Sequence, residues 1–486
     1  MKLKQLLASI PVLEMTADPE TDIAAVRYDS RAVGTGDLFV AIVGYQSDGH
    51  RYIAAAAAQG AAAVLCSRVP EEDIPYILVE DTRPALAELG AAWYGYPERE
   101  LVLIGVTGTN GKTTVTTLIR GLLMDCLGAK VGLIGTIANK IGDEELPTER
   151  TTPESFELRA LLRRMADAGC SHVVMEVSSH ALELHRVDGL RFRCGLFTNL
   201  TQDHLDFHGT MEAYAAAKSK LFSRCDAAAM NADDPWMPFM RERAQCPVLT
   251  WTAAGAEASL RAEDLQLRAD GVRFVLAEGE ERTPIRLGIP GRFSVENALA
   301  VLACAELLGI ERERAAASLA AAQGVTGRVE VVPGTDNCTV VIDYAHTPDA
   351  LENVLETMRE VSTGRLVAVF GCGGDRDRTK RPQMGRIAGA LADVCYVTSD
   401  NPRTEDPEAI IDDILAGMTD SRAEKKVVCL RPEAICRALA ERRSGDVIVL
   451  AGKGHETYQE INHVKNHMDE REIVAEYFAR CGGNGQ

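Results

Sequence analysis

A glycine-rich segment with a lysine and several threonines offers the clearest chemistry in this sequence. It reads Val106-Thr107-Gly108-Thr109-Asn110-Gly111-Lys112-Thr113-Thr114. In such a turn the backbone N–H groups can surround a phosphate, while the lysine reaches the outer phosphates and Thr113 is placed to bind Mg²⁺. The strict eight-residue phosphate-loop pattern fails because Val106 stands where its first glycine belongs. The shorter G-x-x-G-K-T-T pattern that remains predicts a polyphosphate site.

A carboxylate ends a second apolar run, at residues 172–177. Glu176 is placed to complete the Mg²⁺ site begun by Thr113, because Mg²⁺ prefers carboxylate, hydroxyl and phosphate oxygens. The alternative is structural: Ser178 or Ser179, which follow directly, could simply cap a helix.

Two histidines with aspartates beside them follow a third apolar run, at residues 195–198. His204 and His208 have the i,i+4 spacing of a helical metal pair, and Asp203 and Asp206 lie next to them. The zinc-hydrolase pattern H-E-x-x-H is absent, so we expect one histidine near a magnesium site and no dedicated zinc site. A polar loop with capping aspartates is the competing interpretation.

Two lysines lie in a predicted helix at residues 213–222. Both would ordinarily be solvated, but the surrounding alanines and Leu221-Phe222 could bury one amine and lower its pKa. A neutral amine can capture CO₂, which turns a cation into a carbamate able to bind Mg²⁺. Spacing alone does not establish whether Lys218 or Lys220 does so.

Polar loops follow three apolar runs in the carboxy-terminal third of the chain. Their sequences are Gly373-Gly374-Asp375-Arg376, Asp400-Asn401-Pro402-Arg403 and Gly452-Lys453-Gly454-His455-Glu456. Ligands of parallel sheets bind at the carboxyl ends of strands, and an arginine fork binds carboxylates or phosphates at two points. The three loops therefore predict a pocket for a small zwitterion, with ordinary surface salt bridges as the competing interpretation.

The elements that must position these residues alternate between strand and helix. Around the phosphate loop, residues 101–106 are typical of a buried strand, and residues 115–127 repeat apolar side chains at helical spacing. We predict an α/β fold of three domains. Residues 1–98 form an α/β domain, residues 99–328 a central P-loop-type domain with a mostly parallel sheet, and residues 329–486 a Rossmann-like domain. The turn at 324–327 is a plausible hinge.

Composition narrows the class of protein. At 486 residues the chain has room for about three domains. A net charge of −19 argues against nucleic acid as the main ligand. No apolar run approaches the ~20 residues of a membrane span, and no signal-peptide pattern is visible. Thirteen cysteines without a C-x-x-C pair indicate reduced thiols, so we expect a cytoplasmic protein.

Together these segments resemble the Mur ligase family, in particular its members that add meso-2,6-diaminopimelate. The segment T-G-T-N-G-K-T-T marks the wider superfamily, which includes folylpolyglutamate synthase. The segments E-V-S-S-H-A-L, T-N-L-T-Q-D-H-L-D-F-H-G-T-M, D-Y-A-H-T-P-D-A-L, G-C-G-G-D-R-D and A-G-K-G-H-E are far more specific. The resemblance covers essentially the whole chain. It implies an amino-terminal domain for the uridine nucleotide, a central domain for ATP and a carboxy-terminal domain for the amino acid.

The resemblance also implies a role for individual residues of this sequence. Positions for the uridine nucleotide and its muramoyl dipeptide are Tyr28, Ser30, Tyr45, Gln46, Ser47, Thr151, Thr152, Ser178 and Arg186. Positions for ATP are Gly108, Thr109, Asn110, Gly111, Lys112, Thr113, Thr114, Asn297, Arg328 and Asp343, with His346 nearby. Positions for diaminopimelate are Arg376, Asp400, Asn401, Pro402, Arg403, Gly452 and Glu456.

The catalytic set that the resemblance implies is Lys112, Glu176, His204 and Lys218. Thr113, Glu176, His204 and Lys218 would bind Mg²⁺, with Lys218 as its carbamate (N6-carboxylysine); Lys220 does not match the modified position. Two departures affect the dipeptide contacts. Leu184 stands where some relatives have glutamine, and Arg150 precedes Thr151 where others have asparagine.

The implied activity is ATP-dependent ligation of diaminopimelate to UDP-N-acetylmuramoyl-L-alanyl-D-glutamate through an acyl phosphate. It belongs to peptidoglycan precursor synthesis, and so to cell wall biogenesis, cell shape and cell division. We expect a monomer that binds neither nucleic acid nor a membrane. The alternatives are the same chemistry with L-lysine, a folylpolyglutamate synthase-like ligase, and a P-loop nucleotide switch. Arg403 disfavours lysine, because an unpaired buried arginine would cost several kcal/mol.

Overall fold

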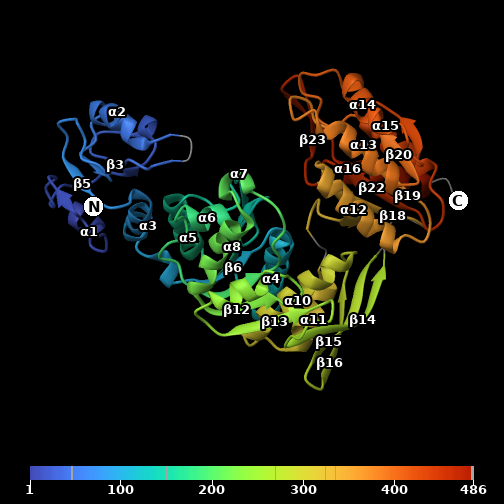
Figure 1. Ribbon diagram of the computed structural model, residues 1–486, viewed down its shortest axis with the longest axis horizontal. Helices are drawn as coiled ribbons and strands as arrows, with labels where there is room; N and C mark the ends of the chain where they lie inside the picture. Colours follow the sequence, from blue (N-terminus) through green and yellow to red (C-terminus); the bar gives the residue numbers. More distant parts are fainter. Residues whose placement is uncertain are drawn as a thin grey trace. The chain divides into compact units, whose positions relative to one another are not determined.

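The computed structural model describes residues 1–44, 47–148, 150–268, 270–322, 325–333, 335 and 337–482. The chain divides into two compact units (Figure 1). The first comprises Met1–Trp251 with Ala303–Ile310, and the second comprises Thr252–Leu302 with Glu311–Gln486. The predicted boundaries of three domains at residues 98 and 328 stay a prediction.

The first unit begins with a small sheet in the strand order β1-β5-β4-β3-β2. Alternate residues of its strands face opposite layers. Leu38 and Val40 pack with Leu86 of helix α3, whereas Phe39 packs with Ile53 of helix α2. The elements are β1 (Glu14–Met15), β2 (Val26–Arg27), β3 (Leu38–Val40), β4 (Ala63–Cys66), β5 (Tyr76–Leu78), α1 (Leu3–Leu6), α2 (Ile53–Ala58) and α3 (Thr82–Trp93).

The larger sheet of the first unit has the order β13-β12-β11-β6-β10-β7-β8-β9 and is parallel from β13 to β7. Its strands are β6 (Val102–Thr107), β7 (Val131–Ile134), β8 (Asn139–Ile141), β9 (Glu144–Leu146), β10 (His172–Glu176), β11 (Phe192–Phe197), β12 (Cys225–Asn231) and β13 (Val248–Thr252). The helices are α4 (Lys112–Leu127), α5 (Ser155–Asp167), α6 (Ser179–Glu183), α7 (Leu205–His208), α8 (Met211–Ser219) and α9 (Met237–Glu242). Because β6, β10 and β11 are adjacent, the predicted loops at their carboxyl ends meet at one edge.

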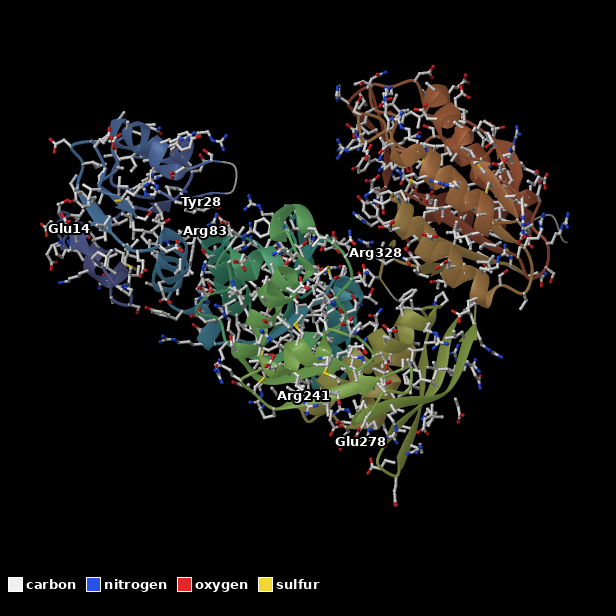
Figure 2. The ribbon with its side chains drawn as sticks, viewed as in Figure 1. Glu14, Tyr28, Arg83, Arg241, Glu278 and Arg328 are labelled. Atoms are coloured by element: carbon white, nitrogen blue, oxygen red, sulfur yellow. The ribbon has the colours of Figure 1, made fainter. Side chains whose placement is uncertain are left out.

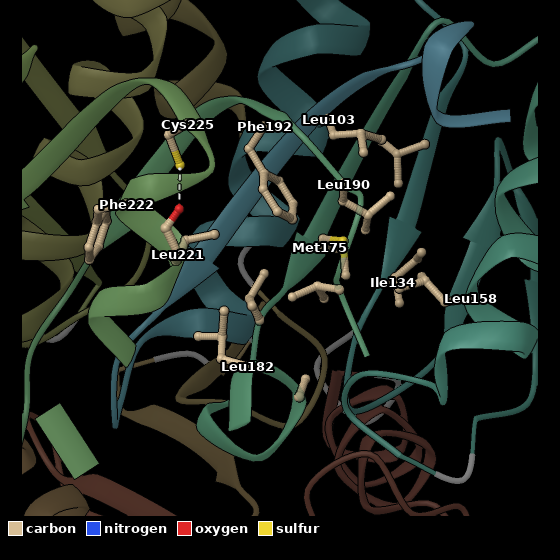
Figure 3. Close-up of a cluster of buried hydrophobic side chains, with 14 of the residues drawn as sticks. Leu103, Ile134, Leu158, Met175, Leu182, Leu190, Phe192, Leu221, Phe222 and Cys225 are labelled. Carbon is tan, nitrogen blue, oxygen red and sulfur yellow. Dashed lines mark hydrogen bonds between the residues drawn. The ribbon is translucent and has the colours of Figure 1, made fainter. Parts of the chain in front are cut away.

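A continuous apolar core holds this sheet against its helices (Figure 3). Leu103, Met175 and Phe192 come from three adjacent strands, and Leu158 joins them from α5. Strand residues next in sequence, such as Ile104 and Val174, are also fully buried. Both faces of the strands are therefore covered, which is why their sequences read as unbroken apolar runs.

The second unit contains an antiparallel meander and a six-stranded sheet. The meander is β14 (Leu260–Arg268), β15 (Gly271–Glu278) and β16 (Glu281–Leu287), accompanied by α10 (Arg292–Leu307) and α11 (Arg312–Ala321). The sheet has the order β17-β18-β22-β19-β20-β21, with only β17 antiparallel. Its strands are β17 (Glu330–Val332), β18 (Thr339–Asp343), β19 (Leu366–Phe370), β20 (Val394–Val397), β21 (Glu424–Val427) and β22 (Val447–Ala451).

Helices cover both faces of this sheet, as expected for a Rossmann-like arrangement. Ile342, Val369 and Ile448 pack with Ile435 of α15 and Val474 of α16, while α12 contacts β19 and β22. The helices are α12 (Pro348–Val361), α13 (Lys380–Leu391), α14 (Pro407–Ala416), α15 (Arg431–Ala440) and α16 (Glu470–Gly482). A separate hairpin is made by β23 (Tyr458–Ile461) and β24 (Val464–His467).

The α/β class predicted from the sequence is confirmed, and strands 339–343 and 366–370 coincide with β18 and β19. The helix after the phosphate loop begins at Lys112, three residues before the predicted start, because the threonines of the loop form its first turn. The predicted helix 213–222 ends at Ser219 and continues as a 3₁₀ turn. Of the predicted hinge, Gly324 lies outside the described residues, and Val325 O accepts from Arg328 N.

Among the residues described, no helix combines the length and the apolar character needed to cross a lipid bilayer. The twelve cysteines in the described part of the chain are thiols, as the sequence predicted.

The packing of Phe192 against β6 generates a stability prediction. Phe192 is fully buried, and a β carbon placed on Gly105 would lie 2.9 Å from its ring. We expect Phe192→Ala to lower the free energy of unfolding by about 3–5 kcal/mol, because it opens a cavity under the central strand. Urea denaturation followed by circular dichroism measures the loss, with Phe192→Leu as the milder control. A loss below about 1 kcal/mol would show that the core collapses into the space.

Candidate active site

The phosphate loop is shaped by contacts with the end of the neighbouring strand. Thr109 N donates to Asn199 O (2.9 Å), and Asn110 N donates to Asn199 Oδ1 (2.9 Å). The Thr198 hydroxyl donates to Asn110 O (2.6 Å). Gly108 has φ of 151°, and a β carbon there would overlap the Thr198 hydroxyl. The close approach explains why glycine stands at this position.

The loop ends in a helix N-terminus, the arrangement that the sequence predicted for anion binding. Gly111 has φ of 85° and precedes α4, whose first residue is Lys112. Lys112 Nζ donates to Gly108 O (2.9 Å) and to Thr109 O (2.8 Å), so the ammonium folds back over its own loop. A phosphate bound by the backbone N–H groups would find this ammonium beside it.

Glu176, at the end of β10, lies beside Thr113 as expected for a shared metal site. The carboxylate is almost fully buried and accepts from the Thr113 hydroxyl (2.9 Å). It also accepts from Thr136 N (2.9 Å) and from the Thr136 hydroxyl (3.0 Å). These oxygens suit Mg²⁺ once the Thr113 hydroxyl turns its lone pairs outward. Ser178 caps α6 through Ala181 N, so the structural interpretation of the serines is correct for Ser178, whereas the Mg²⁺ site stays a prediction.

Lys218 is the lysine that the fold buries. The residue is 1% exposed, and Nζ donates to Gly108 O (2.8 Å). Burial, and then the nearby charge of Lys112, hold the pKa of Lys218 well below its usual value. Lys220 instead pairs with Glu183 at the surface. The sequence expectation of one buried amine with a lowered pKa is confirmed, whereas carbamylation stays a prediction.

The i,i+4 spacing of His204 and His208 does not place the two residues in one helix, and the expected position of one histidine near a magnesium site stays a prediction. His204 has φ of 52° and precedes α7, so its side chain does not share a helical face with His208. His204 lies 3.4 Å from Asp203, and His208 Nε2 lies 3.0 Å from the Ser179 hydroxyl. Both rings contact His180, with centroids 4.8 and 5.6 Å away. The side chain of Asp206 lies outside the described residues.

Burial, and then the neighbouring His180, lower the pKa of His208 to about 4. This histidine is therefore neutral near pH 7. Within the described residues, no three histidine, cysteine, aspartate or glutamate side chains gather as a metal site. A Mg²⁺ ion bound here would thus need ligands of other kinds as well, such as the Thr113 hydroxyl and ligand phosphates.

The dipeptide positions come together at the end of β10. The Thr152 hydroxyl donates to Glu176 O (2.8 Å) and to the Ser178 hydroxyl (3.3 Å), and Arg186 Nη1 donates to Thr152 O (3.1 Å). The Thr151 and Thr136 hydroxyls lie 3.0 Å apart. Burial lowers the pKa of Arg186, although the nearby Glu154 favours its charge. These contacts place hydroxyls and a guanidinium next to the proposed metal carboxylate.

The two departures noted in the sequence fall at this group of residues. Leu184 contributes its backbone oxygen, which accepts from Arg83 Nη1 (3.4 Å), so its side-chain identity is not needed for that contact. Arg150 is exposed. Arg83 also lies 3.6 Å from the Glu154 carboxylate, and thus joins the amino-terminal segment to the dipeptide positions (Figure 2).

Tyr28 lies beside a cavity of about 550 Å³ that is lined by Asn139, Arg150 and Glu157, among others. Its hydroxyl donates to Glu157 Oε1 (2.5 Å), and burial raises the pKa of Tyr28 (Figure 2). Ser30 lies in a 3₁₀ turn capped by Asp29, and the Ser47 hydroxyl lies 3.0 Å from Tyr52 Oη. Tyr45 and Gln46 lie outside the described residues.

The remaining nucleotide positions belong to the second unit. Asp343 is buried at the end of β18 and accepts from Val329 N and Ala345 N (both 2.8 Å). Burial raises its pKa. The Arg328 guanidinium lies 5.3 Å from the centroid of the Tyr344 ring, and Asn297 is buried in α10 (Figure 2).

The three carboxy-terminal loops meet as the strand order requires, at the ends of β19, β20 and β22. Asn401 Nδ2 donates to Glu456 Oε2 (2.9 Å), and Lys453 Nζ bridges Asn401 Oδ1 (2.8 Å) and Glu456 (2.7 Å). Asp400 Oδ2 is buried and accepts no hydrogen bond in the described structure, although the buried Arg431 Nη1 lies 3.9 Å away, and a β carbon on Gly452 would lie 2.7 Å from it. A carboxylate oxygen with free hydrogen-bonding capacity beside a glycine could accept from a ligand ammonium.

Arg376 and Pro402 frame the same loops. Arg376 Nη1 donates to Asp375 O (3.2 Å), and Gly374 N donates to Asn401 O (2.9 Å). A side chain on Gly374 would overlap Pro402 O, so these two loops touch through their backbones. The loops therefore meet, as the pocket interpretation requires, but they also contain the ion pairs Arg403–Glu460 and Lys453–Glu456, and the pocket for a zwitterion stays a prediction.

Arg403 already has a counter-ion. Its Nε donates to Glu460 Oε2 (3.1 Å), and Nη1 donates to Gly374 O (2.8 Å). The expectation that lysine would leave this arginine unpaired is therefore wrong, because Glu460 would still pair with Arg403. Rejection of lysine itself stays a prediction.

Sequence reasoning missed Thr136 and Glu460. Thr136 follows the end of β7, so the search for polar residues after apolar runs would have found it at residues 131–134. Glu460 lies within a hairpin rather than at a strand end, and no spacing links it to Arg403. Only the fold brings the side chains of Glu460 and Arg403 together.

Three family models match consecutive parts of the chain. They are "Mur ligase family, catalytic domain" at residues 22–94, "Mur ligase middle domain" at 106–305 and "Mur ligase, glutamate ligase domain" at 327–454. A UDP-N-acetylmuramoyl-L-alanyl-D-glutamate--2,6-diaminopimelate ligase of Clostridioides difficile is 42% identical, and the match covers 99% of this chain and all of that protein. The chain belongs to the Mur ligase family.

Further Mur ligases agree over the full length. The ligase of the same name from Gloeobacter violaceus is 45% identical over 100% of this chain and 99% of its own. A solved structure of that name has a TM-score of 0.77 at 34% identity, with 99% of both chains covered. The folylpolyglutamate synthase of Mycobacterium tuberculosis has a TM-score of 0.60 at 18% identity, covering 83% of this chain and 96% of that one, and shows a shared fold only.

The burial of Lys218 generates a test of its modification. We expect Lys218→Ala to lose at least about 100-fold in kcat, and short-chain carboxylic acids such as acetate to restore part of it by replacing the carbamate. Lys220→Ala, which removes a surface lysine two residues away, serves as the control and should retain activity. Undiminished activity of Lys218→Ala without added acid would rule out the carbamate.

Proposed function

We propose that this protein is an ATP-dependent amide ligase that adds meso-2,6-diaminopimelate to UDP-N-acetylmuramoyl-L-alanyl-D-glutamate in peptidoglycan precursor synthesis. The observation that carries the proposal is the full-length similarity to ligases of that name, at 42–45% identity. The phosphate loop and the loops at the ends of β19, β20 and β22 supply the chemistry that such an activity needs. We place the reaction in the cytoplasm and expect a monomer.

The reaction has two steps in this proposal. A carboxylate oxygen of the D-glutamyl residue attacks the γ-phosphorus of ATP, the bond to the β-bridging oxygen breaks, and ADP leaves. The diaminopimelate amine then attacks the acyl carbon of the resulting acyl phosphate. The carbon–oxygen bond to phosphate breaks, orthophosphate leaves, and the amine loses a proton.

The first step brings an anion toward a polyanion, so positive charge near the phosphates is the main requirement. Lys112 and the N-terminus of α4 would hold the phosphates, and Arg186 with Thr152 would hold the dipeptide beside them. Asn297, Arg328 and Asp343 would contact the rest of the nucleotide. When bound, Mg²⁺ supplies charge neutralisation at the transferred phosphate. Thr113, Glu176, His204 and the Lys218 carbamate are the ligands that we propose for it.

The protein would recognise the charged groups at the far end of the incoming amino acid through side chains of complementary charge. Asp400 and Asn401 suit the ammonium, and Arg403 suits the distal carboxylate that lysine lacks. Arg376, Gly452 and Glu456 complete the proposed pocket. The folylpolyglutamate alternative is disfavoured, since its structural likeness here is at the level of fold alone.

The decisive experiment measures phosphate release from ATP. We expect release only when the muramoyl dipeptide and diaminopimelate are both present, and loss of release when Mg²⁺ is chelated. A panel including L-lysine and L-glutamate identifies the amino acid. Phosphate release that ignores both substrates would indicate a nucleotide switch, and equal rates with lysine would overturn the choice of diaminopimelate.

Arg403→Ala tests the choice of amino acid more directly. We expect kcat/KM for diaminopimelate to fall by about 100-fold or more, because a charge-assisted contact with the distal carboxylate is lost. The KM for ATP should change less than about twofold, since Arg403 does not serve the nucleotide in this proposal. Steady-state kinetics with each substrate varied in turn measures both quantities. An equal loss for ATP would contradict the assignment.

A further inference from the structure

The hairpin β23–β24 lies against the loop that carries Arg403. Arg403 N donates to Glu460 O (3.1 Å), and Asn462 N donates to Arg403 O (2.8 Å). Arg403 and Ile461 thereby form a parallel bridge. Arg403 has φ of 50°, a backbone conformation that costs free energy in any residue with a side chain. The hairpin holds that conformation because one of its strands pairs with both the N–H and the carbonyl of Arg403.

Side chains extend the same contact to the rest of the loop. Gln459 Nε2 donates to Asp400 O (2.6 Å), and Glu460 N donates to Asn401 Oδ1 (2.8 Å). The hairpin turns at Asn462-His463, both with positive φ, as in a tight two-residue turn. A short, ordered ribbon thus touches three residues of the loop that we propose for the amino acid.

The carboxylate of Glu460 acts on the guanidinium itself. It accepts from Arg403 Nε, while Gly374 O accepts from Nη1, so two hydrogen bonds fix the plane of the fork. The Arg403 and Glu460 side chains are 18% and 21% exposed, which limits how far either can move. A planar group held at two of its nitrogens presents its three remaining N–H donors, one on Nη1 and two on Nη2, in fixed directions.

We propose that Glu460 is a positioning residue for amino-acid recognition: it aims the Arg403 guanidinium at the distal carboxylate of diaminopimelate. This inference rests on the proposed function. Glu460 also keeps Arg403 paired while the pocket is empty, so the guanidinium is ordered before the ligand arrives. The benefit is pre-organisation, which lowers the entropic cost of binding.

An ordinary salt bridge would behave differently. Partly exposed ion pairs contribute little to stability on average, and their loss would not single out one substrate. Loss of a positioning residue, by contrast, should raise the KM for diaminopimelate and leave kcat and the KM for ATP unchanged. This effect should also require that Arg403 is present. These differences define the experiment.

The test compares Glu460→Ala, Glu460→Gln and the control Glu433→Ala by steady-state kinetics on the full chain. Glu433 pairs with Arg437 on α15 and lies outside the proposed pocket. We expect Glu460→Ala to raise the KM for diaminopimelate about tenfold, with kcat and the KM for ATP within about twofold. Glu460→Gln keeps an oxygen acceptor and should stay within about threefold of the unaltered protein, and Glu433→Ala should not differ from it.

A double substitution decides whether Glu460 acts through Arg403. In the Arg403→Ala background, Glu460→Ala should add less than about a twofold change, because the group that it positions is gone. The inference would be overturned if the effects of Arg403→Ala and Glu460→Ala on the KM for diaminopimelate multiply in the double variant. An unchanged KM in Glu460→Ala alone would overturn it as well. If Glu460→Ala fails to fold by circular dichroism, Glu460→Asp replaces it. The shorter side chain should raise the KM at least about threefold, and an unchanged KM would again overturn the inference.

Failure of the proposed function is distinguishable from failure of this inference. If the unaltered protein does not consume diaminopimelate, the proposed function is wrong and the inference falls with it. If the unaltered protein consumes diaminopimelate and the Glu460 variants behave like it, only the positioning role is wrong.

Discussion

Two ammonium groups meet at one carbonyl oxygen, that of Gly108. Lys112 reaches it from the start of α4, and Lys218 reaches it from α8. Like charges this close raise the free energy of one another, and burial raises that of Lys218 further. This concentration of positive charge lies beside the phosphate loop, where we propose that the phosphates of ATP bind. The proposed carbamate on Lys218 would relieve this repulsion, since it turns one of the two cations into an anion.

The sheet topology makes this constraint possible. Strands β6, β10 and β11 are neighbours, so the phosphate loop, Glu176 and the Thr198-Asn199 segment lie at one edge. The carboxy-terminal sheet repeats the arrangement with β19, β20 and β22, whose loops carry a different set of charges. The same topological rule thus positions both groups of loops, the one that we propose for phosphates and the one that we propose for a zwitterion.

Sequence reasoning succeeded where a residue's role follows from its distance to a strand end. It placed Glu176, the phosphate loop and the Asp400–Arg403 loop because parallel strands end at a common edge. The i,i+4 spacing of His204 could not show that this residue precedes α7 with a left-handed backbone, because that conformation depends on tertiary contacts. Sequence reasoning also missed Glu460, because this residue lies within the β23–β24 hairpin and not after a strand end, so its position in the sequence does not indicate that it contacts Arg403. The spacing alone could not show that Lys218 is the buried lysine and Lys220 the exposed one. Only the resemblance to the Mur ligase family or the fold distinguishes them.

The crowding of Gly108 has a consequence beyond catalysis. Its backbone runs so close to Thr198 and Asn199 that a side chain has no room, and its carbonyl already serves two amines. An inhibitor that recognises this stretch of main chain would touch atoms that substitution cannot readily alter. Mutations that confer resistance to such an inhibitor would then have to arise at more distant positions, where they would lower its affinity indirectly.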